Sequence, residues 1–227
     1  MRQPAHLGPF AALLATLLAT LLLAPFLDAE IAGISRFRIF SAAIVLAGLS
    51  AVGRRPRVVV AGLAIAVPAL VIEGWLHAQP SPRLVVANFA LSTAFVLFVA
   101  SAILYAILDE ERVTLDTILG GICVYLLIGV AWTFTYSILE HLAPGSFQVD
   151  GRPLAPIAHL GEFRHEELIY FSFVTLTTVG YGDVLAKTHP ARALAAAEAV
   201  TGSLFIAVFI ARLVGLHMVH QRRDLDL

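Results

Sequence analysis

The stretch that decides the fold of this chain is Thr177-Thr178-Val179-Gly180-Tyr181-Gly182-Asp183. It follows a short apolar run and precedes the last long apolar segment of the sequence. Glycine adopts positive φ without the steric clash of a Cβ atom, and Gly180 and Gly182 stand two residues apart. A backbone that alternates between conformations including positive φ can aim successive carbonyl groups at one axis. The stretch therefore predicts a strip of backbone oxygens, with the Val179 and Tyr181 side chains turned away from it.

These residues resemble the signature of the potassium channel family. The hexamer TVGYGD, residues 178–183, has a chance of roughly a few in a million of arising in a chain of this length at about 1 in 20 per position. In that family, four TVGYG loops replace the hydration shell of a potassium ion with oxygen atoms. The resemblance implies an ion-conducting filter formed by Thr178, Val179, Gly180, Tyr181 and Gly182. The first four of these residues would coordinate K⁺, and Gly182 with Asp183 would shape the outer mouth.

One filter sequence supplies only one strip of oxygens. A closed ring around an ion needs four strips, and a cyclic assembly of identical subunits provides them. The chain contains one copy of the sequence. We therefore expect a homotetramer, with K⁺ as the permeant ion and no cofactor.

A short apolar run, from Glu166 to Thr177, leads into the filter. It is about three helical turns long, too short to cross a bilayer but suited to a re-entrant helix. Acidic residues at its start suit the positive end of a helix dipole. By resemblance to the family, Tyr170 would donate a hydrogen bond to Asp183, and these two residues with Thr177 would support the filter. Some family members carry glutamate where this chain has Val174, so filter inactivation would differ here.

The composition places the chain in a membrane. Hydrophobic residues make up 59% of it and charged residues 14%, against about 45–50% and about 25% in soluble domains. A net charge of -1 gives no electrostatic footprint for nucleic acid, so lipids and ions are the expected partners. The single cysteine, Cys123, lies in an apolar stretch and is expected to be a buried hydrophobic residue.

Six apolar stretches come close to the ~20 residues that a helix needs to cross a ~30 Å hydrocarbon layer. They run from Leu7 to Leu27, Ile34 to Val52, Val58 to Leu76, Leu84 to Leu108, Ile118 to Leu139 and Ala191 to Leu216. Arg36 and Arg38 lie at the start of the second stretch, where snorkelling makes a span tolerable. The first stretch could be a signal peptide, but no A-x-A cleavage site precedes Asp28, so we expect an uncleaved helix.

The expected fold is an all-α membrane protein. Six transmembrane helices would carry a re-entrant pore helix and the selectivity filter between the fifth and the sixth. Residues 1–112 would form a four-helix region that resembles a sensor without its charges. Residues 113–227 would form the pore domain.

The sixth stretch holds the candidate gating residues. Gly202 lies where the family's inner helix carries a hinge glycine, although a small residue packed closely against the pore helix is an equal alternative. Ser203, Ile206, Ile210 and Val214 recur at helical spacing and could line the cavity, or simply pack. Glu198 is a carboxylate inside the membrane, which by default suggests a functional site. The structural alternative, a neutral and hydrogen-bonded Glu198 that braces the pore helix, is preferred.

The family's architecture implies an extracellular pore loop and cytoplasmic termini. The basic residues divide almost evenly between the two sides of the membrane, so the charge bias does not decide the orientation. All but one of the 15 basic residues are arginine, which hints at a GC-rich bacterial genome and hence a bacterial inner membrane. The stretch from Leu84 to Leu108 contains no arginine. Moving one elementary charge across the membrane potential is worth ~2.3 kcal/mol per 100 mV. Because this stretch carries no such charge, steep voltage gating is not expected. The gating stimulus and the role of the first four helices are not assigned by the sequence.

Four other classes of protein are alternatives. A non-selective cation channel is disfavoured by the intact filter sequence, and a transporter with degenerate filter repeats would need several pore segments. An enzyme is not expected, because no nucleophile elbow, metalloprotease helix or phosphate loop is present. A non-conducting partner subunit stays open at this stage.

Overall fold

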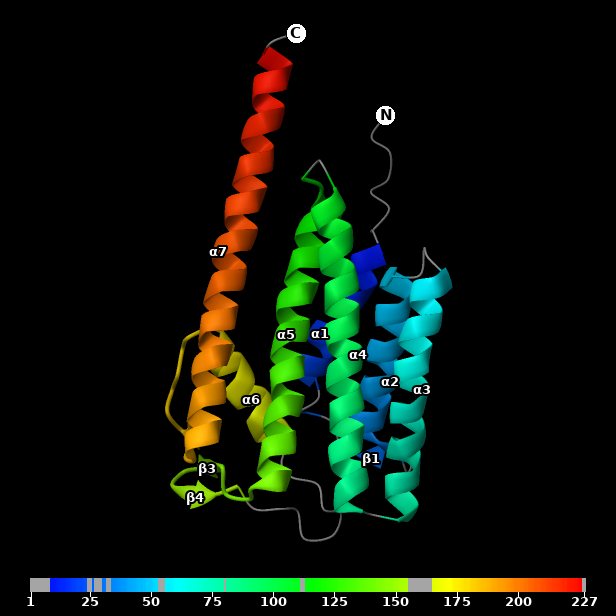
Figure 1. The fold of residues 1–227 in the computed structure, drawn as a ribbon, viewed down its shortest axis with the longest axis vertical. Helices are drawn as coiled ribbons and strands as arrows, with labels where there is room; N and C mark the ends of the chain where they lie inside the picture. Colours follow the sequence, from blue (N-terminus) through cyan, green and yellow to red (C-terminus); the bar gives the residue numbers. More distant parts are fainter. Residues whose placement is uncertain are drawn as a thin grey trace. The chain divides into compact units, whose positions relative to one another are not determined.

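The computed structural model describes residues 9–23, 26, 30–31, 34–52, 56–79, 81–110, 113–154 and 165–225. Helices dominate this part of the chain (Figure 1). They are α1 (Pro9–Leu23), α2 (Arg36–Val52), α3 (Pro56–Ala78), α4 (Pro82–Asp109), α5 (Leu115–Leu142), α6 (His165–Leu176) and α7 (His189–Leu225). The fold is therefore mostly helical, as the composition predicts.

The helix starts follow from local sequence. α3 and α4 begin at Pro56 and Pro82, and proline suits a first helical position because its missing N–H has no partner there. Before α5, the hydroxyl of Thr114 accepts a hydrogen bond from the Thr117 amide at 3.1 Å. Before α7, Thr188 accepts one from the Ala191 amide at 3.4 Å. Both threonines cap helix ends whose first amides would otherwise be unpaired.

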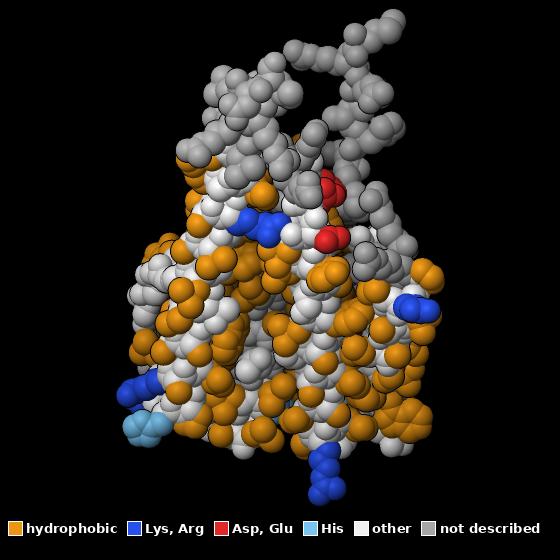
Figure 2. All heavy atoms as spheres, turned by 45° about the horizontal axis from the view of Figure 1, so that its top comes forward, with side chains coloured by type: hydrophobic (Ala, Val, Ile, Leu, Met, Phe, Trp, Pro, Cys, Tyr) orange, Lys and Arg blue, Asp and Glu red, His pale blue; other side chains and the backbone are white. Residues whose placement is uncertain are grey.

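Four of the described helices are long and apolar enough to cross a membrane. Their spans are Pro56–Leu76, Pro82–Asp109, Leu115–Leu142 and His189–Leu216. The chain is thus a multi-pass membrane protein, and hydrophobic side chains cover most of the face seen in Figure 2. The apolar parts of α1 and α2, Phe10–Leu23 and Ala42–Ala51, are shorter than a span needs. The predicted count of six transmembrane helices stays a prediction, and the ends of the first expected stretch lie outside the described residues.

Two small sheets qualify the expectation of an all-α chain. β1 (Glu30–Ile31) pairs with β2 (Ile34–Ser35). The second sheet has three strands in the order β4–β3–β5, formed by Arg152–Pro153, Phe147–Val149 and Val184–Ala186. The β3–β4 turn holds Asp150 at φ 49° and Gly151 at φ 76°. Two consecutive positive φ angles at Asp-Gly are typical of a tight hairpin turn, a signal that the sequence interpretation missed among the prolines and glycines of this region.

The chain forms two compact units. The first contains Met1–Gly62, Phe98–Leu126 and Ala207–Leu227. In this unit Cys123 is buried, as expected. Its thiol donates a hydrogen bond to the Phe10 carbonyl at 3.5 Å. A Cβ on Gly121 would stand 2.0 Å from the ring of Phe209, which shows how closely α5 and α7 approach here. The predicted division into domains 1–112 and 113–227 stays a prediction.

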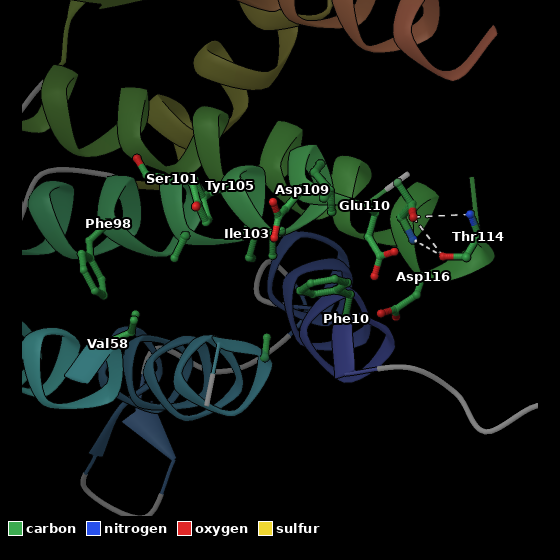
Figure 3. A pocket seen from close by; sticks show the side chains of 15 residues that line it. Phe10, Val58, Phe98, Ser101, Ile103, Tyr105, Asp109, Glu110, Thr114 and Asp116 are labelled. Atoms are coloured by element: carbon green, nitrogen blue, oxygen red, sulfur yellow. Dashed lines mark hydrogen bonds between the residues drawn. The ribbon is translucent and has the colours of Figure 1, made fainter. Parts of the chain in front are cut away.

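A cavity of about 490 Å³ lies within this first unit (Figure 3). Its walls include the apolar side chains of Phe10, Val58 and Phe98. Glu110 and Asp116 lie toward the end of it that is away from Phe98, near Thr114, in Figure 3. None of the filter residues lines this cavity.

The second unit contains Leu63–Leu97 and Leu127–Ile206. Its core is an aromatic cluster of Tyr136, Phe147 and Phe171. The centroids of each pair of rings are 5.2 Å apart, and the rings meet edge to face. Aromatic pairs favour this geometry because the positive ring edge meets the negative face. The cluster joins α5, β3 and α6, and so fixes the short helix that leads into the predicted filter.

Candidate functional site

The predicted filter begins at the C-terminal end of α6. Backbone amides after the helix return to its last turn: Thr178 N–H donates to the Thr175 carbonyl at 2.9 Å, and Val179 N–H donates to the Val174 carbonyl at 2.9 Å. The Gly180 amide contacts the same Val174 carbonyl at 3.3 Å. These bonds satisfy helix-end carbonyls that would otherwise be unpaired. The start of the strip is therefore held by the backbone of α6.

The backbone of the strip alternates in sign of φ. Thr178, Gly180 and Gly182 have φ of 60°, 57° and 81°, whereas Val179 and Tyr181 between them do not have positive φ. Glycine accepts these angles, but a β-branched residue such as Thr178 is rarely found there. Strain of this kind concentrates at functional sites, where the surroundings hold it in place. The sequence predicted positive φ at the two glycines and missed it at Thr178.

The strip is open to the surroundings of a single chain. Val179 is 53% exposed and Tyr181 is 73% exposed. The Tyr181 ring stacks on the Tyr170 ring, with 6.5 Å between centroids and 5° between planes. Apolar side chains of this size are normally covered. In the described part of the chain, all residues from Thr177 to Asp183 are exposed.

Tyr170 and Asp183 form the hydrogen bond that the sequence predicted. The Tyr170 hydroxyl donates to Asp183 Oδ2 at 2.7 Å. The other oxygen, Oδ1, accepts from the Val184 amide at 3.0 Å. The bond from Tyr170 lowers the pKa of Asp183 below its ordinary value. The same bond raises the pKa of Tyr170 to about 12.

This pair should not titrate near neutral pH. A carboxylate with a lowered pKa contributes its bond above its ordinary pKa of 3.8 and loses it as pH falls through the lowered value. A phenol with a raised pKa contributes below its ordinary 10.0 and loses the bond as pH rises through about 12. Between these limits the bond is constant. It therefore holds the Asp183 end of the strip at any physiological pH.

We expect Tyr170→Phe to destabilise conduction while leaving the fold intact. The ring keeps its packing, but Asp183 loses the hydroxyl donor, and bonds to charged acceptors are the stronger kind. Single-channel records should show open dwell times shortened by roughly three- to tenfold. Asp183→Asn should do less harm, because an amide oxygen still accepts from Tyr170. Records of Tyr170→Phe as steady as those of the parent would show that this bond does not support the strip.

The three-stranded sheet holds the end of the strip at Asp183. β5 begins at Val184, directly after Asp183, and pairs with β3 in the register Val149↔Val184. The Asp150 amide donates to the Asp183 carbonyl at 3.1 Å. β3 is in turn positioned by Glu140 at the end of α5, whose carboxylate accepts from the Gly145 amide at 2.6 Å and the Phe147 amide at 3.0 Å. The sequence interpretation found neither Asp150 nor Glu140, although the Asp-Gly turn was a usable signal.

Glu198 lies in a buried polar cluster that connects three helices. It is 0% exposed, and its Oε2 accepts a hydrogen bond from the Tyr136 hydroxyl of α5. Its Oε1 lies 2.5 Å from the Ser172 hydroxyl of α6. Glu198 is therefore hydrogen-bonded to α6, the contact that the structural alternative from the sequence requires. Its partners Tyr136 and Ser172 were not identified from the sequence.

Gly202 packs directly against the end of α6. A Cβ at this position would stand 2.5 Å from the backbone oxygen of Leu176 and 2.8 Å from Leu176 Cδ1. Gly129 of α5 performs the same role, because a Cβ there would stand 2.8 Å from the Phe173 ring. The close-packing alternative therefore describes Gly202 in the structure. A hinge at this residue stays a prediction.

The remaining candidate gating residues lie farther along α7. Ile206, Ile210 and Val214 are all exposed large hydrophobic residues in the single chain. Only 6% of the most apolar window of α7 is buried within the chain. Their role in gating stays a prediction.

The C-terminal part of the chain is similar to a family of ion channels. Residues 156–217 match the model of a family described as ion channel. The match contains α6, the strip and the whole spanning part of α7, His189–Leu216. No curated protein and no solved structure matches the chain.

Proposed function

We propose that this chain is one subunit of a homotetrameric potassium-selective channel that conducts passively. The observation that carries the proposal is the alternation of φ at Thr178, Gly180 and Gly182 within the sequence TVGYGD. An alternating backbone can direct consecutive carbonyl oxygens toward a single ion path, which is how carbonyl filters replace the hydration shell. In this proposal Thr178, Val179, Gly180 and Tyr181 coordinate K⁺.

Exposure within the single chain supports a tetramer. Among the described residues, those of the strip are exposed, and few residues in the spanning part of α7 are buried. Copies related by a fourfold axis would cover both while closing the ring of oxygens. The membrane would be a bacterial inner membrane with both termini in the cytoplasm. The chain would need no cofactor beyond the permeant ion and would have no enzymatic activity.

Voltage is not proposed as the gating stimulus. The part of α4 from Leu84 to Leu108 contains no arginine or lysine. Gating charges are what couple a helix to the membrane potential, at ~2.3 kcal/mol per charge per 100 mV. Open probability should therefore change little with voltage.

The test is flux through the purified full chain in liposomes. We expect potassium to pass at least about tenfold faster than sodium, as carbonyl filters require, and the detergent-solubilised protein to have the mass of a tetramer. Comparable fluxes of the two ions would contradict selectivity and favour a non-selective cation channel. An intact tetramer without flux would indicate a non-conducting partner subunit. An active dimer would contradict the symmetry argument.

A further inference from the structure

The cluster around Glu198 contains more acceptors than one hydroxyl proton can satisfy. Ser172 Oγ lies 2.5 Å from Glu198 Oε1 and 2.8 Å from the carbonyl oxygen of Gly129. Tyr136, Ser172 and Glu198 are all 0% exposed. Both contacts of Ser172 have hydrogen-bond length. The question is which group supplies the proton for each.

Counting protons gives one arrangement in which every contact is a hydrogen bond. A carbonyl oxygen can only accept, so Ser172 must use its single proton toward Gly129. The bond between Ser172 and Glu198 then needs a proton on Glu198. The Tyr136 hydroxyl donates its proton to the other carboxyl oxygen, which is an acceptor in either protonation state.

The surroundings of Glu198 favour the same state. In the described part of the chain, both of its hydrogen-bond partners are hydroxyls, and neither is a cation. An ionised carboxylate buried without a counter-charge is strongly disfavoured, most of all inside a membrane. A protonated carboxyl group offers one donor and one acceptor, which is what the cluster provides for.

We propose that Glu198 is a neutral carboxylic acid that donates to Ser172, and that it acts as a positioning residue for the predicted filter. Donation runs from Tyr136 to Glu198, from Glu198 to Ser172, and from Ser172 to the Gly129 carbonyl. This series of hydrogen bonds joins α5, α6 and α7. Because α6 leads directly into Thr177, the cluster fixes where the strip begins. The positioning role rests on the proposed function, but the protonation state does not.

The protonation state can be read by infrared spectroscopy of the reconstituted full chain. At neutral pH, the difference spectrum between parent and Glu198→Gln should contain the carbonyl stretch of a protonated carboxylic acid. Glu140 offers a matched control, since it is also 0% exposed but accepts only from backbone amides, which always donate. The Glu140→Gln variant should keep the Glu198 band. A carboxylate band in the Glu198→Gln difference, or loss of the acid band in Glu140→Gln, would overturn the proposal.

Potassium flux tests the positioning role. Glutamine reproduces one donor and one acceptor without charge, so Glu198→Gln should conduct within about threefold of the parent. Glu198→Ala leaves the Tyr136 hydroxyl without its acceptor and Ser172 without its donor, and should lower flux by at least about tenfold. Thr201→Val on the same helix removes only an exposed bond to the Ala197 carbonyl and should conduct normally. Loss of flux in Glu198→Gln equal to that in Glu198→Ala would show that charge is required and would refute the proposal.

The two proposals fail in different ways. If the parent chain does not conduct potassium, the proposed function fails, while the infrared band still reports on Glu198. If the parent conducts and the acid band is absent, the neutral brace fails alone.

Discussion

Gly202→Ala should abolish potassium flux while the chain still reaches the membrane. The added Cβ would stand 2.5 Å from the backbone oxygen of Leu176, closer than Cβ atoms approach in proteins. A side chain can rotate out of such a contact, but a backbone carbonyl at the end of a helix cannot. The end of α6 or the adjoining turn of α7 must therefore move. The strip starts at the next residue, Thr177, and would move with it.

Overpacking of this kind costs roughly 1–3 kcal/mol, and a tetramer incurs it in each of four subunits. We expect flux to fall by at least about a hundredfold, because a change of about 2.7 kcal/mol suffices. The control is Gly215→Ala on the same helix, where a Cβ meets nothing within 4 Å. Alanine also favours the helix by about 1 kcal/mol over glycine. Parent-like flux in Gly202→Ala, or equal losses in both variants, would remove the packing argument.

Gly180→Ala should destroy discrimination between potassium and sodium. Gly180 has φ of 57°, and a Cβ there meets nothing within 4 Å of the same chain. The substitution therefore tests backbone conformation rather than crowding within the subunit. An L-residue in this region costs roughly 1–2 kcal/mol, and relief of that strain would turn the neighbouring carbonyls away from the path. We expect the potassium-to-sodium flux ratio to fall from at least about tenfold to near one.

Gly145→Ala is the matched control for this prediction. Gly145 also has positive φ, 84°, and a Cβ there also meets nothing within 4 Å, but the residue lies outside the strip. Both variants should lose similar thermal stability. Only Gly180→Ala should lose selectivity. If both variants remain selective, the alternating backbone does not set the ion path.

The parts of the fold that the sequence predicted are those with local signals. The length of the apolar stretches predicted the four helices that can span a membrane. The bounds of α6 differ from the expected ones by one residue at each end. The TVGYGD sequence located the strip because positive φ is a local property of glycine. The β3–β4 hairpin also had a local signal in Asp150-Gly151, but it was hidden in a region interpreted only as a loop. Pairing of β3 with β5, far apart in sequence, had none.

The supporting contacts of the site could not be found in the same way. Ser172 and Tyr136 are ordinary residues for a membrane helix. They are 26 and 62 residues away from Glu198 in the sequence, and only the folded chain brings them into hydrogen-bond contact with it. The sequence did identify Glu198 as unusual, because a carboxylate in a membrane needs an explanation. It could not choose between hinge and packing for Gly202. That choice depends on the distance to Leu176, which no pattern encodes.

One contact of the first unit bears on the order in which the chain can be completed during synthesis. The guanidinium of Arg212 donates to the carbonyls of Ile107, Leu108 and Glu110 at the C-terminal end of α4, over separations of 102 to 105 residues. At roughly 5–20 residues per second, the ribosome finishes α4 at least about five seconds before Arg212 is made. During that interval these carbonyls must bond to water or lipid head groups. The end of α4 therefore reaches its final state only after most of the last helix has been made.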